Sequence, residues 1–145
     1  ELGLQDNVII KDFVENQELP ELYNQSSVFI LPSLAEGVPR TILEAMACGT
    51  PVVCTNLPQL IKIVSECGLL IPPGDSDAIA RSLADLASDR KMAQAYGREG
   101  RMRAVSSYSW NDTVARTSEL YSSLTKEYAG IISRKVEERS EHGET

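Results

Sequence analysis

Short runs of consecutive apolar residues alternate with helical patterns along this chain, and this alternation limits its fold more narrowly than any other feature. The runs are Val28–Leu31, Val52–Cys54 and Gly68–Ile71. Continuous apolar runs of this length are typical of strands that are buried on both faces of a sheet. Parallel strands need long crossover connections, which are usually helices. The sequence therefore predicts an α/β domain with a Rossmann-like parallel sheet flanked by helices.

The other apolar and helical patterns complete this outline. The segment Val8–Val14 is predicted to form a further strand. Helices are predicted near residues 18–25, 39–49, 57–66 and 75–124, the last of them broken near 97–100 and again near 106–109. Residues 1–125 are assigned to one domain, and residues 126–145 to a charged tail that begins as a helix and then frays.

An apolar stripe marks the last predicted helix. Its members recur at helical spacing and are Trp110, Val114, Thr117, Tyr121 and Leu124. A tryptophan at the head of such a helix is most simply a core residue. If the stripe were exposed instead, it would favour self-association through the C-terminal helix.

Composition and charge exclude several classes of protein. The net charge of −7 argues against a nucleic-acid-binding protein, which would need a basic face. The only histidine, His142, lies in the polar tail, so a histidine-based triad or a zinc site is not expected. The three cysteines form no C-x-x-C pair, which favours a reduced, cytoplasmic protein. No apolar run reaches the roughly 20 residues that a membrane helix needs.

The segment Pro32–Val53 carries the residues that point to chemistry. It has the sequence PSLAEGVPRTILEAMACGTPVV, and its glutamates Glu36 and Glu44 are separated by seven residues. Glu36 falls in the loop after a predicted strand, and Glu44 falls in the helix that begins near Pro39. Ligands of open parallel sheets bind beyond the carboxyl ends of the strands, where this loop is expected to lie.

The start of that helix is suited to an anion. A helix N-terminus presents unpaired N–H groups and a partial positive charge. The backbone amides near Val38, Arg40 and Thr41 are available to a phosphate, and Gly37 allows a ligand to approach the backbone closely. A carboxylate such as Glu44 can accept two hydrogen bonds side by side, as a vicinal diol such as a ribose would offer.

Structural roles for Glu44 are an alternative. A glutamate early in a helix complements the helix dipole, and Glu44 is placed to pair with Arg40 one turn earlier. Its neighbours in sequence are apolar, however, and a carboxylate is costly to bury there without a partner. Residue chemistry alone leaves both interpretations open.

The wider sequence resembles a known family. The segment around Glu36 and Glu44 is similar to the E-x7-E signature of retaining glycosyltransferases of the GT-B fold, known as group 1 or family 4. The similarity runs in order from about residue 2 to residue 124. It includes EAMACGTPVV at 44–53, GLLIPPGD at 68–75 and YSW at 108–110. The resemblance identifies the chain as part of the C-terminal, donor-binding half of such an enzyme.

The resemblance implies a function for each residue of the motif. The domain would bind a nucleotide-diphosphate sugar, with Glu44 holding the ribose hydroxyls and Glu36 acting as the catalytic contact to the donor sugar. Backbone amides in the segment Gly37–Thr41 would hold the diphosphate. A hexosyl group would be transferred to an unidentified acceptor with retention of configuration, without an obligatory metal. The location would be cytoplasmic, with peripheral membrane attachment compatible with the full-length protein.

The chain departs from the family pattern in two respects. The family often has Glu-Gly-Phe-Gly where this chain has Glu36-Gly37-Val38-Pro39, so the shape of the loop differs and one backbone donor is lost. The family's Gly-rich turn, its Arg/Lys pair and its N-terminal acceptor domain have no counterpart here. We therefore expect the chain to be a fragment of a longer enzyme and to be inactive alone.

Several other functions are compatible with parts of the sequence. Asp75-Ser76-Asp77 matches a D-x-D metal motif, but its position before a helix favours a capping role for Asp75. Two carboxylates are also compatible with a glycoside hydrolase, although the chain is poor in aromatic residues. The absence of G-x-G spacing argues against a dehydrogenase. A sugar-nucleotide epimerase of the same fold, or a non-catalytic sugar-nucleotide-binding fragment, remain as alternatives.

Overall fold

A three-stranded parallel sheet forms the centre of the larger of two compact units. The computed structural model describes residues 3–141 and divides the chain into units at residues 1–106 and 107–145. The strands are β1 (Phe29–Leu31), β2 (Val52–Thr55) and β3 (Leu69–Ile71), in the order β1-β2-β3. Phe29 pairs with Val52, and Val53 pairs with Leu69. The predicted Rossmann-like parallel sheet is therefore confirmed.

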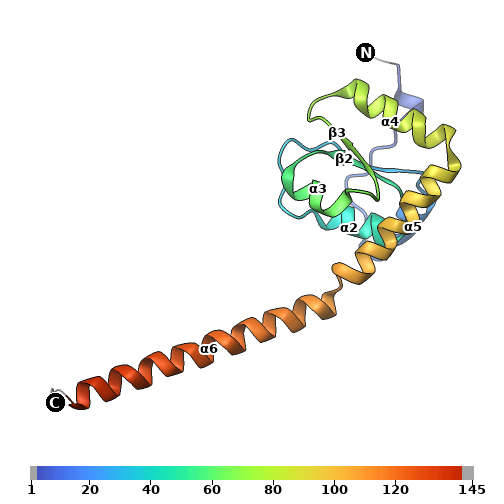
Figure 1. Cartoon of the computed structure of the whole chain (residues 1–145). Helices are drawn as coiled ribbons and strands as arrows, with labels where there is room; N and C mark the ends of the chain where they lie inside the picture. Colours follow the sequence, from blue (N-terminus) through green and yellow to red (C-terminus); the bar gives the residue numbers. More distant parts are fainter. Residues whose placement is uncertain (1–2, 142–145) are drawn as a thin grey trace. The chain divides into compact units, whose positions relative to one another are not determined.

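Helices connect the strands and cover both faces of the sheet. In the larger unit they are α1 (Leu19–Gln25), α2 (Arg40–Ala47), α3 (Pro58–Val64), α4 (Ser76–Ser88) and α5 (Arg90–Ser107), and a 3₁₀ turn, η1, spans Gln5–Asn7. A further helix, α6 (Trp110–Glu141), belongs to the second unit. The crossover helices α2 and α3 contact β1, β2 and β3, whereas α4 contacts β3. Figure 1 shows α2 and α3 on one side of β2 and β3, with α4 on the other.

The alternation of side chains along each strand explains why both faces of the sheet are apolar. Successive side chains of a strand point to opposite faces. Val53 belongs to a cluster with Ile71, Ala78 and Leu86, so it faces α4, and α5 adds Met92 and Tyr96 to this cluster. Val52 and Cys54 must point the other way, toward the α2 and α3 side. All four residues of β2 are at most 1% exposed, as a central strand requires.

A close contact between glycines fixes α5 against the end of α2. Gly49 ends α2 in the left-handed conformation, with φ of 79°, which a side chain would strain. A Cβ atom at Gly97 of α5 would stand 2.2 Å from the carbonyl oxygen of Gly49. The Arg101 guanidinium, one turn further along α5, donates to the Ala47 carbonyl and satisfies an end group of α2.

Two predictions about local structure are wrong. Val8–Val14 is not a strand, and Ile9 and Ile10 are 86% and 84% exposed, because no other described strand pairs with this segment. The predicted break near 97–100 does not occur, since α5 runs through it and Gly97 is buried where the backbones approach closely. The predicted break near 106–109 is confirmed, because α5 ends at Ser107 and α6 begins at Trp110.

The second unit consists mainly of α6. This helix continues through Lys126 to Glu141, and Trp110 is 74% exposed, so the prediction that Trp110 is a core residue is wrong. Among the described residues of this unit no other helix or strand packs against α6, and Val114, Tyr121 and Leu124 of its apolar stripe are exposed. No helix in the described part of the chain is long and apolar enough to cross a membrane. His142 lies outside the described residues.

Candidate functional site

The loop that carries Glu36 is held at the carboxyl edge of the sheet by three hydrogen bonds. The Ser33 hydroxyl donates to Oε1 of Glu36 at 2.7 Å. The Thr55 hydroxyl, at the end of β2, donates to the Ser33 carbonyl at 2.7 Å. The Gln59 side-chain amide of α3 donates to the backbone carbonyl of Glu36. The neighbouring elements β2 and α3 therefore fix the loop backbone, and Ser33 within the loop holds one oxygen of the Glu36 carboxylate.

The N-terminus of α2 is open to an anion. Its N-cap residue is Pro39, which makes no capping hydrogen bond through its side chain, and the first turn carries no acidic residue. Arg40 and Thr41 are exposed there. The N–H groups of the first turn have no partner within the helix, so they remain available to a ligand. A Cβ atom built on Gly37 meets nothing within 4 Å, so the space in front of the loop is also open.

Glu44 lies one turn into α2 and faces α1. The Tyr23 hydroxyl donates to Oε2 of Glu44 at 3.1 Å. The Tyr23 ring is 9% exposed and meets the Phe29 ring edge-on, with centroids 5.7 Å apart. Burial, and then the hydrogen bond and negative charge of Glu44, raise the pKa of Tyr23 to about 12. The phenol therefore stays protonated at neutral pH and acts as a donor.

A groove of about 370 Å³ lies between α1 and α2 and contains Glu44. Its lining residues are Asn16, Leu19, Pro20, Tyr23, Arg40, Glu44, Ala47 and Cys48. Arg40, Glu44 and Ala47 of α2, with Cys48 at its C-cap, recur at i, i+4, i+7 and i+8, which places them on one face of the helix. The groove thus combines an apolar wall from α1 with a carboxylate, a cation and an amide. This composition suits a ligand that has an apolar ring, hydroxyls and negative charge.

The structure gathers the predicted site residues around one helix end. Gly37 and Val38 lie in the loop, Arg40 and Thr41 begin α2, and Glu36 and Glu44 flank that start. Glu44 has the partner that its apolar surroundings require, and this partner is Tyr23 on α1. Sequence analysis did not identify Tyr23, Asn16 or Cys48 as site residues. The signal in the sequence was Glu44 itself, because a carboxylate among apolar neighbours needs a hydrogen-bond donor such as the Tyr23 hydroxyl.

The D-x-D sequence has a structural role at its first residue. Oδ1 of Asp75 accepts a hydrogen bond from the backbone N–H of Ala78 at 2.8 Å, so Asp75 caps α4. The predicted capping role is confirmed. Among the described residues, no group of three or more His, Cys, Asp or Glu side chains is arranged to hold a metal ion.

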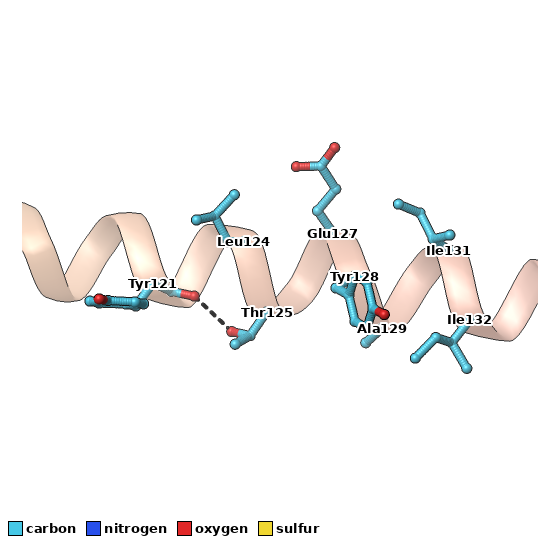
Figure 2. A pocket seen from close by; sticks show the side chains of 8 residues that line it. All are labelled: Tyr121, Leu124, Thr125, Glu127, Tyr128, Ala129, Ile131 and Ile132. Carbon is cyan, nitrogen blue, oxygen red and sulfur yellow. Dashed lines mark hydrogen bonds between the residues drawn. The ribbon is translucent and has the colours of Figure 1, made fainter.

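A second hollow follows the surface of α6. Figure 2 shows the side chains that line it, all from this one helix, with a hydrogen bond from the Thr125 hydroxyl to the Tyr121 carbonyl. Leu124 and Ile131 point to the same side of the helix in this view, as does Glu127. Because a single helix supplies every lining residue, the hollow is an exposed apolar surface and does not resemble an enclosed ligand site.

The family model for "Glycosyl transferases group 1" matches residues 1–103 of the chain. This chain belongs to the group 1 glycosyltransferases. The resemblance inferred from the motifs is therefore confirmed at the level of the family.

Curated relatives and solved structures agree with this assignment. The O-antigen chain mannosyltransferase B of Escherichia coli is 38% identical over 115 residues, which are 77% of this chain and 29% of the relative. The MMP alpha-(1->4)-mannosyltransferase of Mycolicibacterium hassiacum is 35% identical over 83% of this chain and 30% of its own length. A sucrose-phosphate synthase from Thermosynechococcus elongatus superposes with a TM-score of 0.82 at 31% identity, over 86% of this chain and 32% of that one.

One solved structure concerns an isolated domain. The C-terminal domain of a glycosyl transferase group 1 family protein from Francisella tularensis superposes with a TM-score of 0.64 at 28% identity, over 70% of this chain and 53% of that chain. This chain spans about a third or less of the mannosyltransferases and the synthase. The match to a C-terminal domain agrees with the part of the fold that the motifs predicted.

Proposed function

We propose that this chain is the donor-binding part of a glycosyltransferase that uses a nucleotide-diphosphate sugar. The observation that carries the proposal is the arrangement at α2, where Glu36 and Glu44 flank an open helix N-terminus beside a groove. Membership of group 1 supports it, since the similar proteins include two mannosyltransferases. We assign a hexose as the transferred sugar.

Each part of the site would contact one part of the donor. The Glu44 carboxylate would accept hydrogen bonds from the ribose hydroxyls within the α1–α2 groove. The backbone amides of Gly37, Val38 and Thr41, with the Arg40 guanidinium, would hold the diphosphate. Glu36 would contact the donor sugar, since Ser33 holds its carboxylate at the edge of the sheet.

The reaction breaks the bond between the anomeric carbon and the diphosphate oxygen. The acceptor hydroxyl forms the new glycosidic bond and gives its proton to the departing diphosphate, and we propose that configuration is retained. Charge develops on the departing diphosphate, so donors fixed at the α2 N-terminus would stabilise the transition state without rearranging. We propose that no metal is obligatory. The N-terminus of α2, together with cations from the rest of the enzyme, would neutralise the negative charge on the diphosphate.

The remaining assignments concern the whole protein. We propose that residues 1–125 form the donor-binding domain, that 126–145 form a tail, and that an acceptor domain elsewhere in the enzyme completes the site. The chain alone would then be inactive. A cytoplasmic location, with peripheral membrane attachment, stays a prediction, as do family 4 membership and self-association through α6.

Calorimetric titration of the full-length enzyme with UDP, GDP and ADP tests donor binding. We expect one nucleotide to bind in the micromolar range and Glu44→Gln to weaken it by about tenfold, as loss of a charged hydrogen-bond acceptor would. Asp85→Asn, which removes an exposed carboxylate from α4, is the matched control and should leave affinity unchanged. The proposal fails if no nucleotide binds, or if Glu44→Gln binds as tightly as the wild type.

A product assay separates the enzymatic alternatives. An epimerase of the same fold would interconvert sugar nucleotides when no acceptor is present, whereas a transferase would consume the donor only with an acceptor. A non-catalytic binding protein would bind the nucleotide and turn over neither substrate.

A further inference from the structure

We propose that Tyr23 is a positioning residue that holds the Glu44 carboxylate in the orientation needed to bind the ribose hydroxyls of the donor. This inference rests on the proposed function of Glu44. The observation behind it is the 3.1 Å hydrogen bond from the Tyr23 hydroxyl to Oε2 of Glu44, which joins α1 to α2 across 21 residues of sequence.

Tyr23 is itself held firmly. Its backbone carbonyl accepts a 2.8 Å hydrogen bond from the buried Thr50 hydroxyl, beyond the end of α2. Its ring packs edge-on against Phe29, the first residue of β1. The backbone, the ring and the hydroxyl of Tyr23 therefore contact three different parts of the fold. A side chain fixed in this way is a rigid reference point for the flexible Glu44 side chain.

The hydrogen bond leaves Glu44 able to bind a ligand. An ionised carboxylate has about four acceptor positions, and Tyr23 occupies one of them. Both Tyr23 and Glu44 line the α1–α2 groove, so the remaining acceptor positions lie beside space that a ligand can fill. The long side chain of Glu44 would otherwise lose rotamer freedom when a diol binds, and Tyr23 removes part of that cost before the donor arrives.

The test compares a ribonucleotide with its 2′,3′-dideoxy analogue in the full-length enzyme. The nucleotide is whichever nucleoside diphosphate the wild type binds. We expect the wild type to prefer the ribonucleotide by tenfold or more, and Tyr23→Phe to lose most of this preference by binding the ribonucleotide about tenfold more weakly. Affinity for the dideoxy analogue should stay the same, because it offers Glu44 no diol. Tyr96→Phe, which removes a hydroxyl from another packed tyrosine, should behave as the wild type.

Kinetics and a double variant complete the test. Tyr23→Phe should raise the donor KM and leave kcat within about twofold, since the lost interaction is made equally in the ground and transition states. In a Glu44→Ala background, Tyr23→Phe should have almost no further effect on ribonucleotide affinity, because the carboxylate that Tyr23 positions is already absent.

The outcomes separate the two claims. If the wild type does not distinguish the ribonucleotide from the dideoxy analogue, the ribose role of Glu44 is wrong and the positioning role falls with it. If the wild type distinguishes them and Tyr23→Phe does so equally well, only the positioning role is overturned. The preference is a ratio within each variant, so it can be measured even if Tyr23→Phe lowers stability.

Discussion

Gly97 of α5 lies so close to Gly49, at the end of α2, that a Cβ atom at Gly97 would stand 2.2 Å from the Gly49 carbonyl oxygen. This contact fixes α5 against the turn between α2 and β2. Because α2 carries Glu44 and begins at the proposed diphosphate site, the glycine contact supports the site from the opposite end of the helix.

Gly97→Ala is expected to destabilise the larger unit. The added methyl would meet backbone, which cannot move aside easily, so the free energy of unfolding should fall by about 2–3 kcal/mol. Gly100→Ala, one turn along α5, is the matched control. Its Cβ would meet the Met46 side chain at an ordinary 3.5 Å, so this variant should be at least as stable as the wild type. Urea unfolding measures both, and equal stability of the two variants would contradict the contact.

Gly37→Ala should leave stability almost unchanged and weaken donor binding. The added Cβ meets no atom of the protein within 4 Å, so stability should change by no more than about 0.5 kcal/mol. The methyl would, however, project where the donor approaches the backbone, and donor affinity should fall by about tenfold. Thermal unfolding and calorimetric titration measure the two effects, and unchanged affinity would remove Gly37 from the diphosphate site.

Glu36→Gln should lower kcat with little change in donor KM. Glutamine keeps an oxygen that can accept the Ser33 hydrogen bond, so the loop should hold its shape while the charge is lost. If Glu36 acts on the donor sugar in the transition state, kcat should fall by roughly 10²–10³. Steady-state kinetics of the full-length enzyme measure this. A raised KM with unchanged kcat would mean that Glu36 contributes only to donor binding.

Cys48 should be the cysteine that reports on donor binding. It is half-buried and lines the groove with Glu44, whereas Cys54 and Cys67 are buried. Burial raises the pKa of both buried thiols, so few of them ionise near neutral pH, and the thiolate is the form that reacts. Iodoacetamide should therefore modify Cys48 first, and a bound nucleoside diphosphate should slow the reaction. Mass spectrometry of the modified peptides would detect this, and modification that the nucleotide does not slow would place the nucleotide elsewhere.

Stability should fall as the pH rises above about 9. Burial raises the pKa of Cys54 from 9.0 to about 12, so the thiol stays neutral in the folded protein after it has ionised in the unfolded chain. The unfolded state therefore gains stability between these two values, and the free energy of unfolding decreases across this window. Cys54→Ala should be less stable at neutral pH but should lose less on going from pH 7 to pH 10. Urea unfolding under reducing conditions tests this, and equal losses would show that Cys54 does not contribute.

The sequence predicted most elements of the sheet layer, because their apolar patterns are local. β1, β2 and β3 correspond to continuous apolar runs, and α2 falls within the helix predicted near residues 39–49. The segment 8–14 shows the limit of this method. Its apolar pattern shows which side chains the segment would bury if it formed a strand. A strand also needs hydrogen bonds to a neighbouring strand, and no described element supplies these to the segment.

The errors in the helices and the gaps in the site have a related cause. Gly97 was interpreted as a helix breaker, although its small size serves a contact with Gly49, which is distant in sequence. Tyr23 falls within the helix predicted near residues 18–25, but its hydrogen bond to Glu44 depends on how α1 packs against α2. Composition predicts which residues need partners, whereas tertiary packing decides which partners they obtain.

A crystal structure of the full-length enzyme with its bound nucleoside diphosphate would show whether the ligand contacts Glu44 and the start of α2. We expect the ribose hydroxyls to lie within hydrogen-bond distance of the Glu44 carboxylate, and the diphosphate to face the backbone N–H groups at the start of α2. A nucleotide bound away from the α1–α2 groove, with Glu44 contacting only Tyr23, would contradict it.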